Sequence, residues 1–150
     1  MSSVIAPLTA VAAVTAGIVA GLFFVFSVVI MPALARIPGS AGIAAMQAIN
    51  IVIIRALFLV VFLGTAVATV ALALLAPDPL HLLAAAAYVI GVIGVTAAVN
   101  VPLNNALDAV AADSADGERL WRHYLTRWTA WNHVRTVTST VAMAALVLAG

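Results

Sequence analysis

Long runs without a charged side chain constrain this sequence more than any other feature. Residues 1–35 contain no Asp, Glu, Lys or Arg, and neither do residues 56–77 or residues 79–107. A hydrocarbon core about 30 Å thick needs about 20 apolar residues per helical crossing. Inside lipid, every backbone N–H and C=O must be paired within the structure, so such runs form helices. The sequence therefore predicts an integral membrane protein of the all-α class.

The composition supports this class and excludes several others. Hydrophobic residues make up 66% of the 150-residue chain and charged residues only 7%, whereas soluble domains carry about 25% charged residues. The absence of cysteine excludes disulfide scaffolds, thiol catalysis and Cys-ligated metal sites. A formal net charge of +1 offers no basic field for nucleic acid. Arginine is the sole basic residue type apart from histidine, and alanine is abundant, which suggests a bacterial protein of the inner (plasma) membrane.

The charge-free runs define four expected spans in one transmembrane domain. These spans cover about residues 8–30, 51–76, 82–99 and 129–149. Pro77-Asp78-Pro79 separates the second span from the third by a tight hairpin, because two prolines and an aspartate break a helix. The last span has a short apolar part and must include the polar turns of residues 128–135. We expect a four-helix bundle.

An additional cytoplasmic helical segment is expected before the last span. Asp116 is a candidate N-cap, and Glu118 falls in the first turn that would follow it. Trp121, Tyr124 and Trp128 recur at spacings of three and four residues, as on one helix face. We expect this helix to run directly into the last span.

The arginines predict how the chain is oriented. They lie in or beside the two long connections, residues 31–50 and 100–127, or at the adjoining ends of spans: Arg36, Arg55, Arg119, Arg122, Arg127 and Arg135. Positively charged loops remain on the cytoplasmic side of a membrane. The long connections are therefore expected in the cytoplasm, with both termini outside.

Polar side chains gather at one membrane depth. The set comprises Gln47, Asn50, Arg55, Asn100, Asn104, Asn105, Asn132, His133 and Arg135. Trp128, Asn132, Arg135 and Ser139 have the spacing of one helical stripe, and His133 points about a quarter turn away from it. Ionisable residues inside a membrane usually face the bundle interior or a wet cavity. The density of polar groups predicts a pocket.

Purely structural interpretations of the same residues remain open. Arginines near helix ends extend to the lipid headgroups, and Trp and Tyr form interfacial belts. Asparagines hold helices together. No pair of histidines has the spacing of a helical metal site, so no metal is expected. Gly17-x3-Gly21 allows close helix approach, within the bundle or in a homo-oligomer.

Several motifs together resemble a known family. They are Phe-Ser at 26–27, Met-Pro-Ala-Leu at 31–34, Met46-Gln47 with Asn50, Asn-Val-Pro-Leu-Asn at 100–104, and Trp128-x2-Trp-Asn-His-Val-Arg-Thr ending at Thr136. In order and spacing they resemble the anthrone oxygenase family. This resemblance implies a four-helix integral membrane protein whose fungal relatives oxidise polyketide anthrones to anthraquinones with dioxygen and no established cofactor.

The chemistry that the resemblance implies suits the residues present. Removal of a proton from an anthrone or hydroquinone gives an electron-rich anion that reacts with dioxygen without a metal or other cofactor. In this hypothesis His133, or a water that it holds, is the base. Oxyanion stabilisation falls to Arg135, Arg55, Asn100, Asn104 and Asn132, while Asn50, Trp128, Trp131 and Tyr124 bind a flat lipophilic aromatic substrate.

Two alternatives from other classes accompany this hypothesis. The same amides and arginines could bind or transport a quinone, a lipid or a small organic anion. Alternatively, the chain could be a structural subunit whose residues 116–128 dock a partner.

Overall fold

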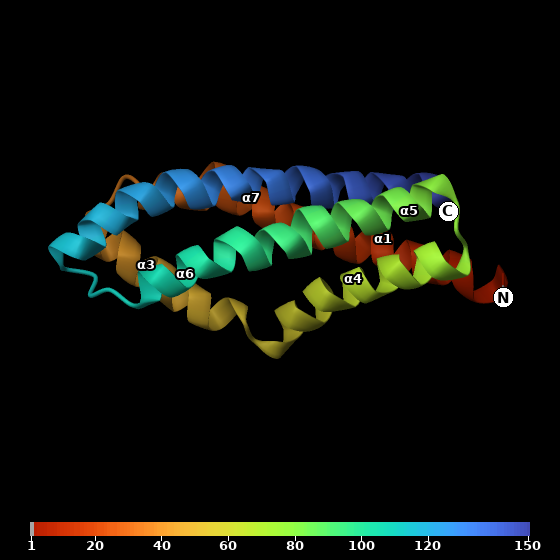
Figure 1. Cartoon of the computed structure of the whole chain (residues 1–150), viewed down its shortest axis with the longest axis horizontal. Helices are drawn as coiled ribbons and strands as arrows, with labels where there is room; N and C mark the ends of the chain where they lie inside the picture. Colours follow the sequence, from red (N-terminus) through yellow and green to blue (C-terminus); the bar gives the residue numbers. More distant parts are fainter. Residues whose placement is uncertain (1) are drawn as a thin grey trace.

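The computed structural model describes residues 2–150, and every regular element among them is helical (Figure 1). In chain order the elements, with π-helical segments marked η, are α1 (Ser2–Val25), η1 (Phe26–Ile30), α2 (Met31–Leu34), α3 (Gly39–Ile53), α4 (Ala56–Leu75), α5 (Pro79–Ala86), η2 (Ala87–Gly94), η3 (Thr96–Asn100), α6 (Val101–Asp108) and α7 (Ala115–Ala149). The expected all-α class is confirmed.

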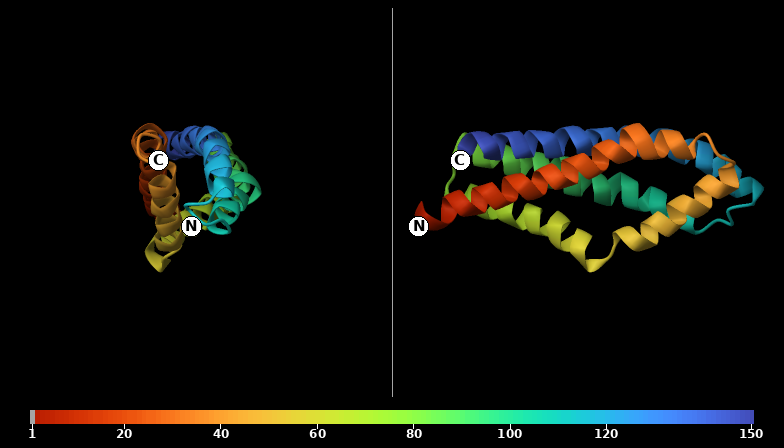
Figure 2. Two further views of the ribbon diagram at one scale, coloured as in Figure 1. Left: turned by 90° about the vertical axis from the view of Figure 1, so that its left-hand side faces the viewer. Right: turned by 180° about the vertical axis from the view of Figure 1, so that it is seen from behind.

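The elements form four long helical runs along one axis (Figure 2). The first run is α1 with η1 and α2, the second α3 followed by α4, the third α5 to α6, and the fourth α7. α1 packs along α7, while α4 lies against α1 and α5. The C-terminus and the start of α1 lie at the same end (Figure 1).

Three of these runs contain helices long and apolar enough to cross a membrane. They cover Val4–Leu34, Leu57–Leu75 and Pro79–Asp108. α7 is not among them, because Asn132, His133 and Arg135 lower the mean hydropathy of its apolar second half. Its second half packs along α1. The chain is therefore a membrane protein, and the fourth crossing, at residues 129–149, stays a prediction.

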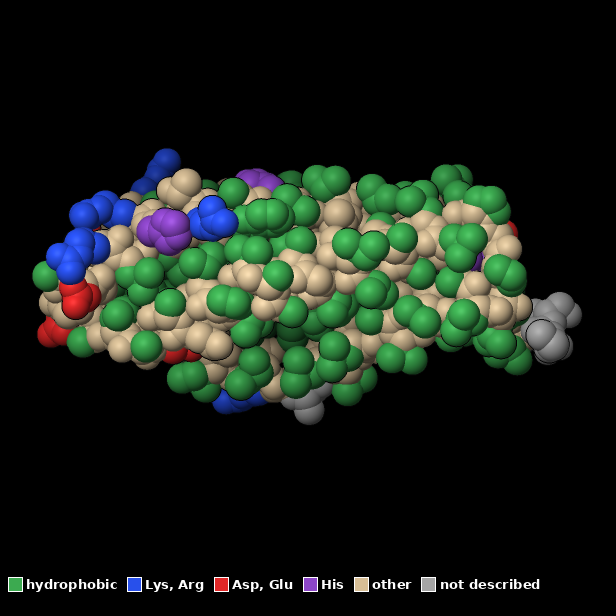
Figure 3. Space-filling model, viewed as in Figure 1, with side chains coloured by type: hydrophobic (Ala, Val, Ile, Leu, Met, Phe, Trp, Pro, Cys, Tyr) green, Lys and Arg blue, Asp and Glu red, His purple; other side chains and the backbone are tan. Residues whose placement is uncertain are grey.

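All charged side chains except Asp78 lie in one half of the molecule. In Figure 3 the arginines and most of the acidic side chains gather toward the end that holds the α6–α7 loop, and hydrophobic side chains cover the rest of that face. Asp78 lies at the opposite end, in the α4–α5 hairpin. The apolar half has the surface that a bilayer requires.

The first and third helices extend beyond their expected bounds of 8–30 and 82–99. Pro32 and Pro102 do not end them, because each proline occupies one of the first positions of a new α-helical segment directly after a π-helical one. A proline at the start of a helix loses no hydrogen bond that the helix needs. The π-helical turns let the chain pass each proline without leaving the helix.

The expected second span, 51–76, is wrong at its start. The helix breaks at Ile54 and Arg55, and Arg55 has an extended backbone with ψ of 153°. Residues 51–53 therefore belong to α3, a helix within the segment expected as a connection. Ile51 to Ile54 are all β-branched, and such residues lose rotamer freedom in a helix, which favours a break here.

α7 confirms the additional helix that continues into the last expected span. Its cap differs from the expected Asp116: Ser114 precedes the helix, and its hydroxyl accepts a hydrogen bond from the Gly117 N–H at 2.9 Å. Asp116 and Glu118 lie in the first turn, where a negative charge is favourable.

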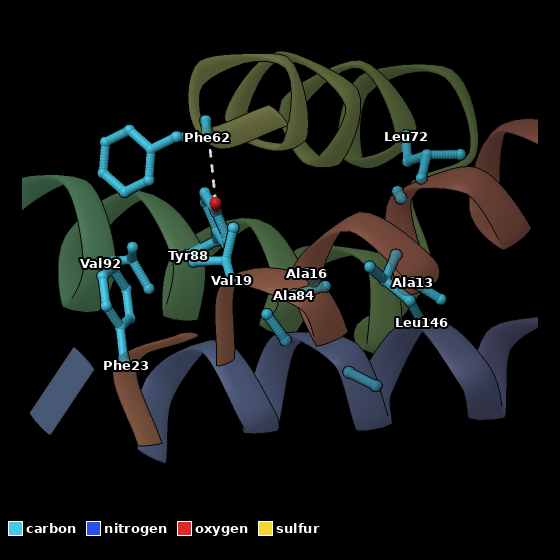
Figure 4. Close-up of a cluster of buried hydrophobic side chains, with 13 residues drawn as sticks. Ala13, Ala16, Val19, Phe23, Phe62, Leu72, Ala84, Tyr88, Val92 and Leu146 are labelled. Atoms are coloured by element: carbon cyan, nitrogen blue, oxygen red, sulfur yellow. Dashed lines mark hydrogen bonds between the residues drawn. The ribbon is translucent and has the colours of Figure 1, made fainter. Parts of the chain in front are cut away.

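Two hydrophobic clusters hold the helices together. The first, nearer the termini, packs small residues of α1 against α5, η2 and α7, with Phe62 and Tyr88 between them (Figure 4). The Tyr88 hydroxyl donates to the Phe62 carbonyl at 3.1 Å. The second cluster lies toward the α6–α7 loop and contains Trp121, Tyr124 and Trp128. The candidate site lies between these clusters, since Phe62 of the first and Trp128 of the second both line it.

Candidate active site

A cavity of about 240 Å³ lies between α1, the α3–α4 break, η3, α6 and α7. Most of its lining is apolar, and five polar residues project from three walls. The lining residues are Leu22, Phe23, Phe26, Met46, Ile49, Asn50, Ile53, Ile54, Phe58, Leu59, Phe62, Leu63, Thr96, Asn100, Val101, Asn104, Trp128 and Arg135. The sequence therefore predicted correctly that a pocket lies at the depth of the amides.

One stripe of α7 forms the polar wall behind the cavity. Trp128, Asn132, Arg135 and Ser139 are all buried, as their spacing predicts. Of these four, Trp128 and Arg135 line the cavity itself.

Arg135 is 5% exposed, and its guanidinium lies against two aromatic faces. Its central carbon is 4.2 Å from the centre of the Phe23 ring and 5.1 Å from that of Trp128. It donates to the Thr96 hydroxyl at 3.2 Å and to the Asn132 carboxamide oxygen at 2.6 Å, while Nε has no partner among the described residues. No carboxylate of residues 2–150 forms a salt bridge with it. The cavity thus contains a buried cation held only by neutral groups.

Asn132 holds Arg135 and does not line the cavity. It is fully buried, and its amide nitrogen donates to the Phe23 carbonyl and to the Ser27 hydroxyl, both at 2.7 Å. Its oxygen accepts the bond from Arg135. Asn132 therefore links α7 to α1 and η1 and orients the guanidinium.

Asn100 lines the same cavity and contains a buried acceptor without a partner among the described residues. It is 1% exposed, and its amide nitrogen donates to the Trp128 carbonyl at 3.3 Å. That contact fixes which end of the amide is nitrogen, because a carbonyl can only accept. The remaining Oδ1 is buried without a partner among the described residues. A buried unpaired acceptor is costly unless a ligand or water bonds to it.

Asn104 accepts hydrogen bonds from two aromatic residues of α7. Its Oδ1 accepts hydrogen bonds from the Tyr124 hydroxyl and the Trp128 indole N–H, both at 2.8 Å. Tyr124 stacks between Trp121 and Trp128, with ring centres 5.6 and 5.9 Å apart. Trp128 therefore lines the cavity, whereas Tyr124 stacks on the Trp128 ring and does not line the cavity.

Two polar residues of α3 join this helix to α6. Asn50, which lines the cavity, donates to Asp108 Oδ1 at 3.2 Å. Gln47 donates to the backbone carbonyls of Leu107 and Val110 at 2.9 and 3.0 Å. These bonds close the end of the cavity that faces the α6–α7 loop.

Besides Asn132 and Tyr124, three further residues that the sequence assigned to the site do not line the cavity. Arg55 is exposed at the α3–α4 break, and His133 is exposed on the outer face of α7. Trp131 is half-buried and is likewise absent from the lining. On an α-helix the residue after Asn132 is rotated by about 100°, which carries the imidazole out of the buried stripe.

Thr96 and the aromatic wall of the cavity were not predicted from the sequence. Thr96 lies four residues before Asn100 and eight before Asn104, so the same spacing that paired the two asparagines would have included it. Phe23, Phe58 and Phe62 form the apolar side of the cavity. Nothing in the sequence distinguishes these phenylalanines from other core residues.

The described residues contain no group of three or more His, Cys, Asp or Glu side chains placed to hold a metal ion. The expectation of a reaction without metal or cofactor stays a prediction.

Comparison with known proteins gives one match. The profile of the anthrone oxygenase family matches residues 51–145, more than half of the chain. No curated protein and no solved structure matches. The matched segment contains the α4 wall of the cavity, Asn100, Asn104 and Arg135, whereas Asn50 lies directly before it. The chain belongs to the anthrone oxygenase family.

Proposed function

We propose that this protein is an oxygenase whose cavity binds a flat, lipophilic anthrone- or hydroquinone-type substrate as its oxyanion against Arg135. The observation that carries the proposal is the burial of Arg135 without a carboxylate partner. A buried cation is costly unless a counter-charge accompanies it. A bound anion would offset this cost, and the Phe23 and Trp128 rings stabilise the cation in part when no anion is bound.

The unpaired polar atoms specify the ligand further. Arg135 Nε is a donor and Asn100 Oδ1 is an acceptor, and both residues line the cavity. Neither atom is exposed to the empty cavity, so a ligand that carries an oxyanion or carbonyl and a hydroxyl group would bond to both only after the two side chains rotate. The apolar, aromatic remainder of the lining suits fused or substituted aromatic rings. A cavity of about 240 Å³ is slightly smaller than the usual range for drug-sized ligands, so a compact molecule fits best.

The reaction follows from stabilising that anion. An anthrone loses one proton from its methylene carbon, and the negative charge moves to the carbonyl oxygen beside Arg135. The electron-rich carbon then attacks dioxygen and forms a carbon–oxygen bond, which gives a peroxide. Loss of the second proton from this carbon breaks the O–O bond: the inner oxygen becomes the new carbonyl, and the outer oxygen leaves as hydroxide and takes up a proton to form water. The carbon is oxidised by four electrons, and one dioxygen molecule accepts all four.

The chain's own contribution in this proposal is electrostatic. Arg135 lowers the free energy of the anion, and Asn132 and Thr96 hold the guanidinium in place. Donors positioned in this way contribute about 10²-fold or more in rate. Because His133 is exposed and absent from the lining, we assign the proton to a water molecule inside the cavity.

Dioxygen uptake tests the proposal. Purified protein is mixed with emodin anthrone, and spontaneous autoxidation is subtracted. We expect Arg135→Lys to lose at least about tenfold in enzyme-dependent rate, because an ammonium lacks the planar fork of donors. Arg127→Lys changes an exposed arginine of the same helix and serves as the matched control.

Two outcomes would contradict the proposal. Equal rates for Arg135→Lys and Arg127→Lys would remove Arg135 from the reaction. Tight binding of anthrones or quinones without any enzyme-dependent uptake would identify a binding or transport protein instead.

A further inference from the structure

The cavity is open on one side, and its rim is apolar. The lining residues at this rim lie on α4, on α6 and at the α3–α4 break, and they are 37–64% exposed: Ile54 64%, Leu59 37%, Leu63 49% and Val101 42%. No arginine or acidic residue belongs to the lining apart from the buried Arg135. In Figure 3 the corresponding part of the surface, over α4 and the third helical run, is covered by hydrophobic side chains.

The length of α4 fixes the depth of this rim in a bilayer. α4 has 20 residues, which at 1.5 Å per residue span about 30 Å, the thickness of a hydrocarbon core. Asp78 follows one end and Arg55 precedes the other, so the two charged residues mark the two interfaces. Phe58 to Leu63 then lie within about 12 Å of the Arg55 interface.

The helix break gives independent evidence for the same depth. Residues 54 and 55 interrupt the helix, and no side chain caps the backbone N–H groups at the start of α4. Unpaired backbone groups cannot lie in the hydrocarbon and are satisfied at the interface by water or headgroups. Arg55, exposed at this break, is suited to a lipid phosphate.

We infer that the cavity opens laterally into the leaflet next to the α6–α7 loop. We call the opening bounded by Ile54, Leu59, Leu63 and Val101 the lateral portal. A phospholipid acyl chain occupies this portal between turnovers, with the lipid phosphate beside Arg55, and the lipophilic substrate enters from the same leaflet. The inference rests on the proposed function, because both concern one cavity.

Trp128 reports on this opening, since its ring lines the cavity while only 5% of the residue is exposed. A variant with Trp121→Phe and Trp131→Phe leaves Trp128 as the single tryptophan. It is reconstituted in phosphatidylcholine vesicles whose acyl chains carry bromine either near the headgroup or near the chain end. We expect bromine near the headgroup to reduce Trp128 fluorescence at least about twofold more than bromine near the chain end, and aqueous iodide to have little effect.

Matched variants separate the portal from general lipid contact. Val101→Phe fills the rim and should reduce quenching by bromolipid, whereas Ile90→Phe, at a more exposed apolar position away from the cavity, should not. If the double variant does not fold, bromolipid quenching is measured in the unmodified chain and in Trp128→Phe. The difference between the two gives the quenching of Trp128.

The results that would overturn the portal are specific. Quenching of Trp128 by iodide but not by bromolipid would show an aqueous entrance, and quenching by neither would show a closed cavity. Because the readout is independent of turnover, quenching without dioxygen uptake would retain the portal and reject the oxygenase. Dioxygen uptake without quenching would retain the oxygenase and reject the portal.

Discussion

The guanidinium of Arg135 donates a 2.6 Å hydrogen bond to the carboxamide oxygen of Asn132, three residues earlier on α7. The same amide donates to the Phe23 carbonyl and to Ser27. Arg135 is thus oriented through a neutral group that is itself fixed to α1 and η1. A neutral partner leaves the positive charge available to a ligand, which a carboxylate at this place would not do.

Asn132 and Asn100 should differ in what they contribute to stability. We expect Asn132→Leu to lower the free energy of unfolding by about 1–3 kcal/mol, because it leaves buried groups of Phe23, Ser27 and Arg135 without a partner. Asn100→Leu removes one long bond and an unpaired acceptor, so the loss should be less than about 1 kcal/mol. Thermal unfolding in detergent measures both. Equal losses would mean that Asn100 also serves packing.

His133 should contribute little to turnover. Its side chain is exposed and absent from the cavity lining, so we expect His133→Ala to retain at least about half of the dioxygen uptake with an unchanged pH profile. His123→Ala, at another exposed histidine of α7, is the control. Loss of most activity in His133→Ala alone would restore the base that the sequence suggested.

Acid should weaken the α4–α5 hairpin through Asp78. The backbone N–H of His81, followed by that of Leu80, hydrogen-bonds to this carboxylate and lowers its pKa below the usual value of about 3.9. A lowered folded pKa stabilises the fold above the unfolded pKa, and this contribution disappears as the pH falls through the folded value. We expect the Tm difference between the unmodified chain and Asp78→Ala to be present at pH 7 and to shrink below about pH 4. A difference that is constant over this range would show that the cap has no role.

The orientation of the chain can be tested directly because it lacks cysteine. With the arginine-rich loop in the cytoplasm, an impermeant thiol reagent applied to intact cells should label Ser2→Cys and leave Ser114→Cys unlabelled until the cells are broken. Labelling of Ser114→Cys from outside would invert the topology and place the portal in the other leaflet.

Periodicity made part of the site predictable. Trp128, Asn132, Arg135 and Ser139 follow the repeat of one helix face, and all four are buried on α7. Asn100 and Asn104, four residues apart, both line the cavity. A spacing rule works here because each helix is continuous at these positions.

The rest of the candidate site depends on tertiary geometry, which residue spacing does not predict. The helix break at Ile54 and Arg55 places Arg55 at the surface, and the absence of charged residues, on which the span prediction rested, does not indicate this break. Asn132 and Asn100 are the same residue type and were expected at the same membrane depth. Asn132 nevertheless binds Arg135 outside the cavity lining, whereas Asn100 belongs to the lining. Which partner satisfies each amide is a tertiary property, so the sequence could locate the polar layer without assigning its members.

The π-helical segments act as rotational offsets in the third helical run. Each π-turn closes its hydrogen bond one residue later than an α-turn, so residues after the segment face a different direction than an uninterrupted α-helix would give them. Tyr88 and Val92, within η2, face the apolar cluster, whereas Asn100 and Asn104, at and beyond the end of η3, face the cavity and α7. One helix thus supplies hydrocarbon to the core over part of its length and amides to the ligand over the next. A single-residue deletion between Thr96 and Asn100 would cancel the offset and rotate Asn104 away from Tyr124 and Trp128 while leaving the rest of the membrane helix intact.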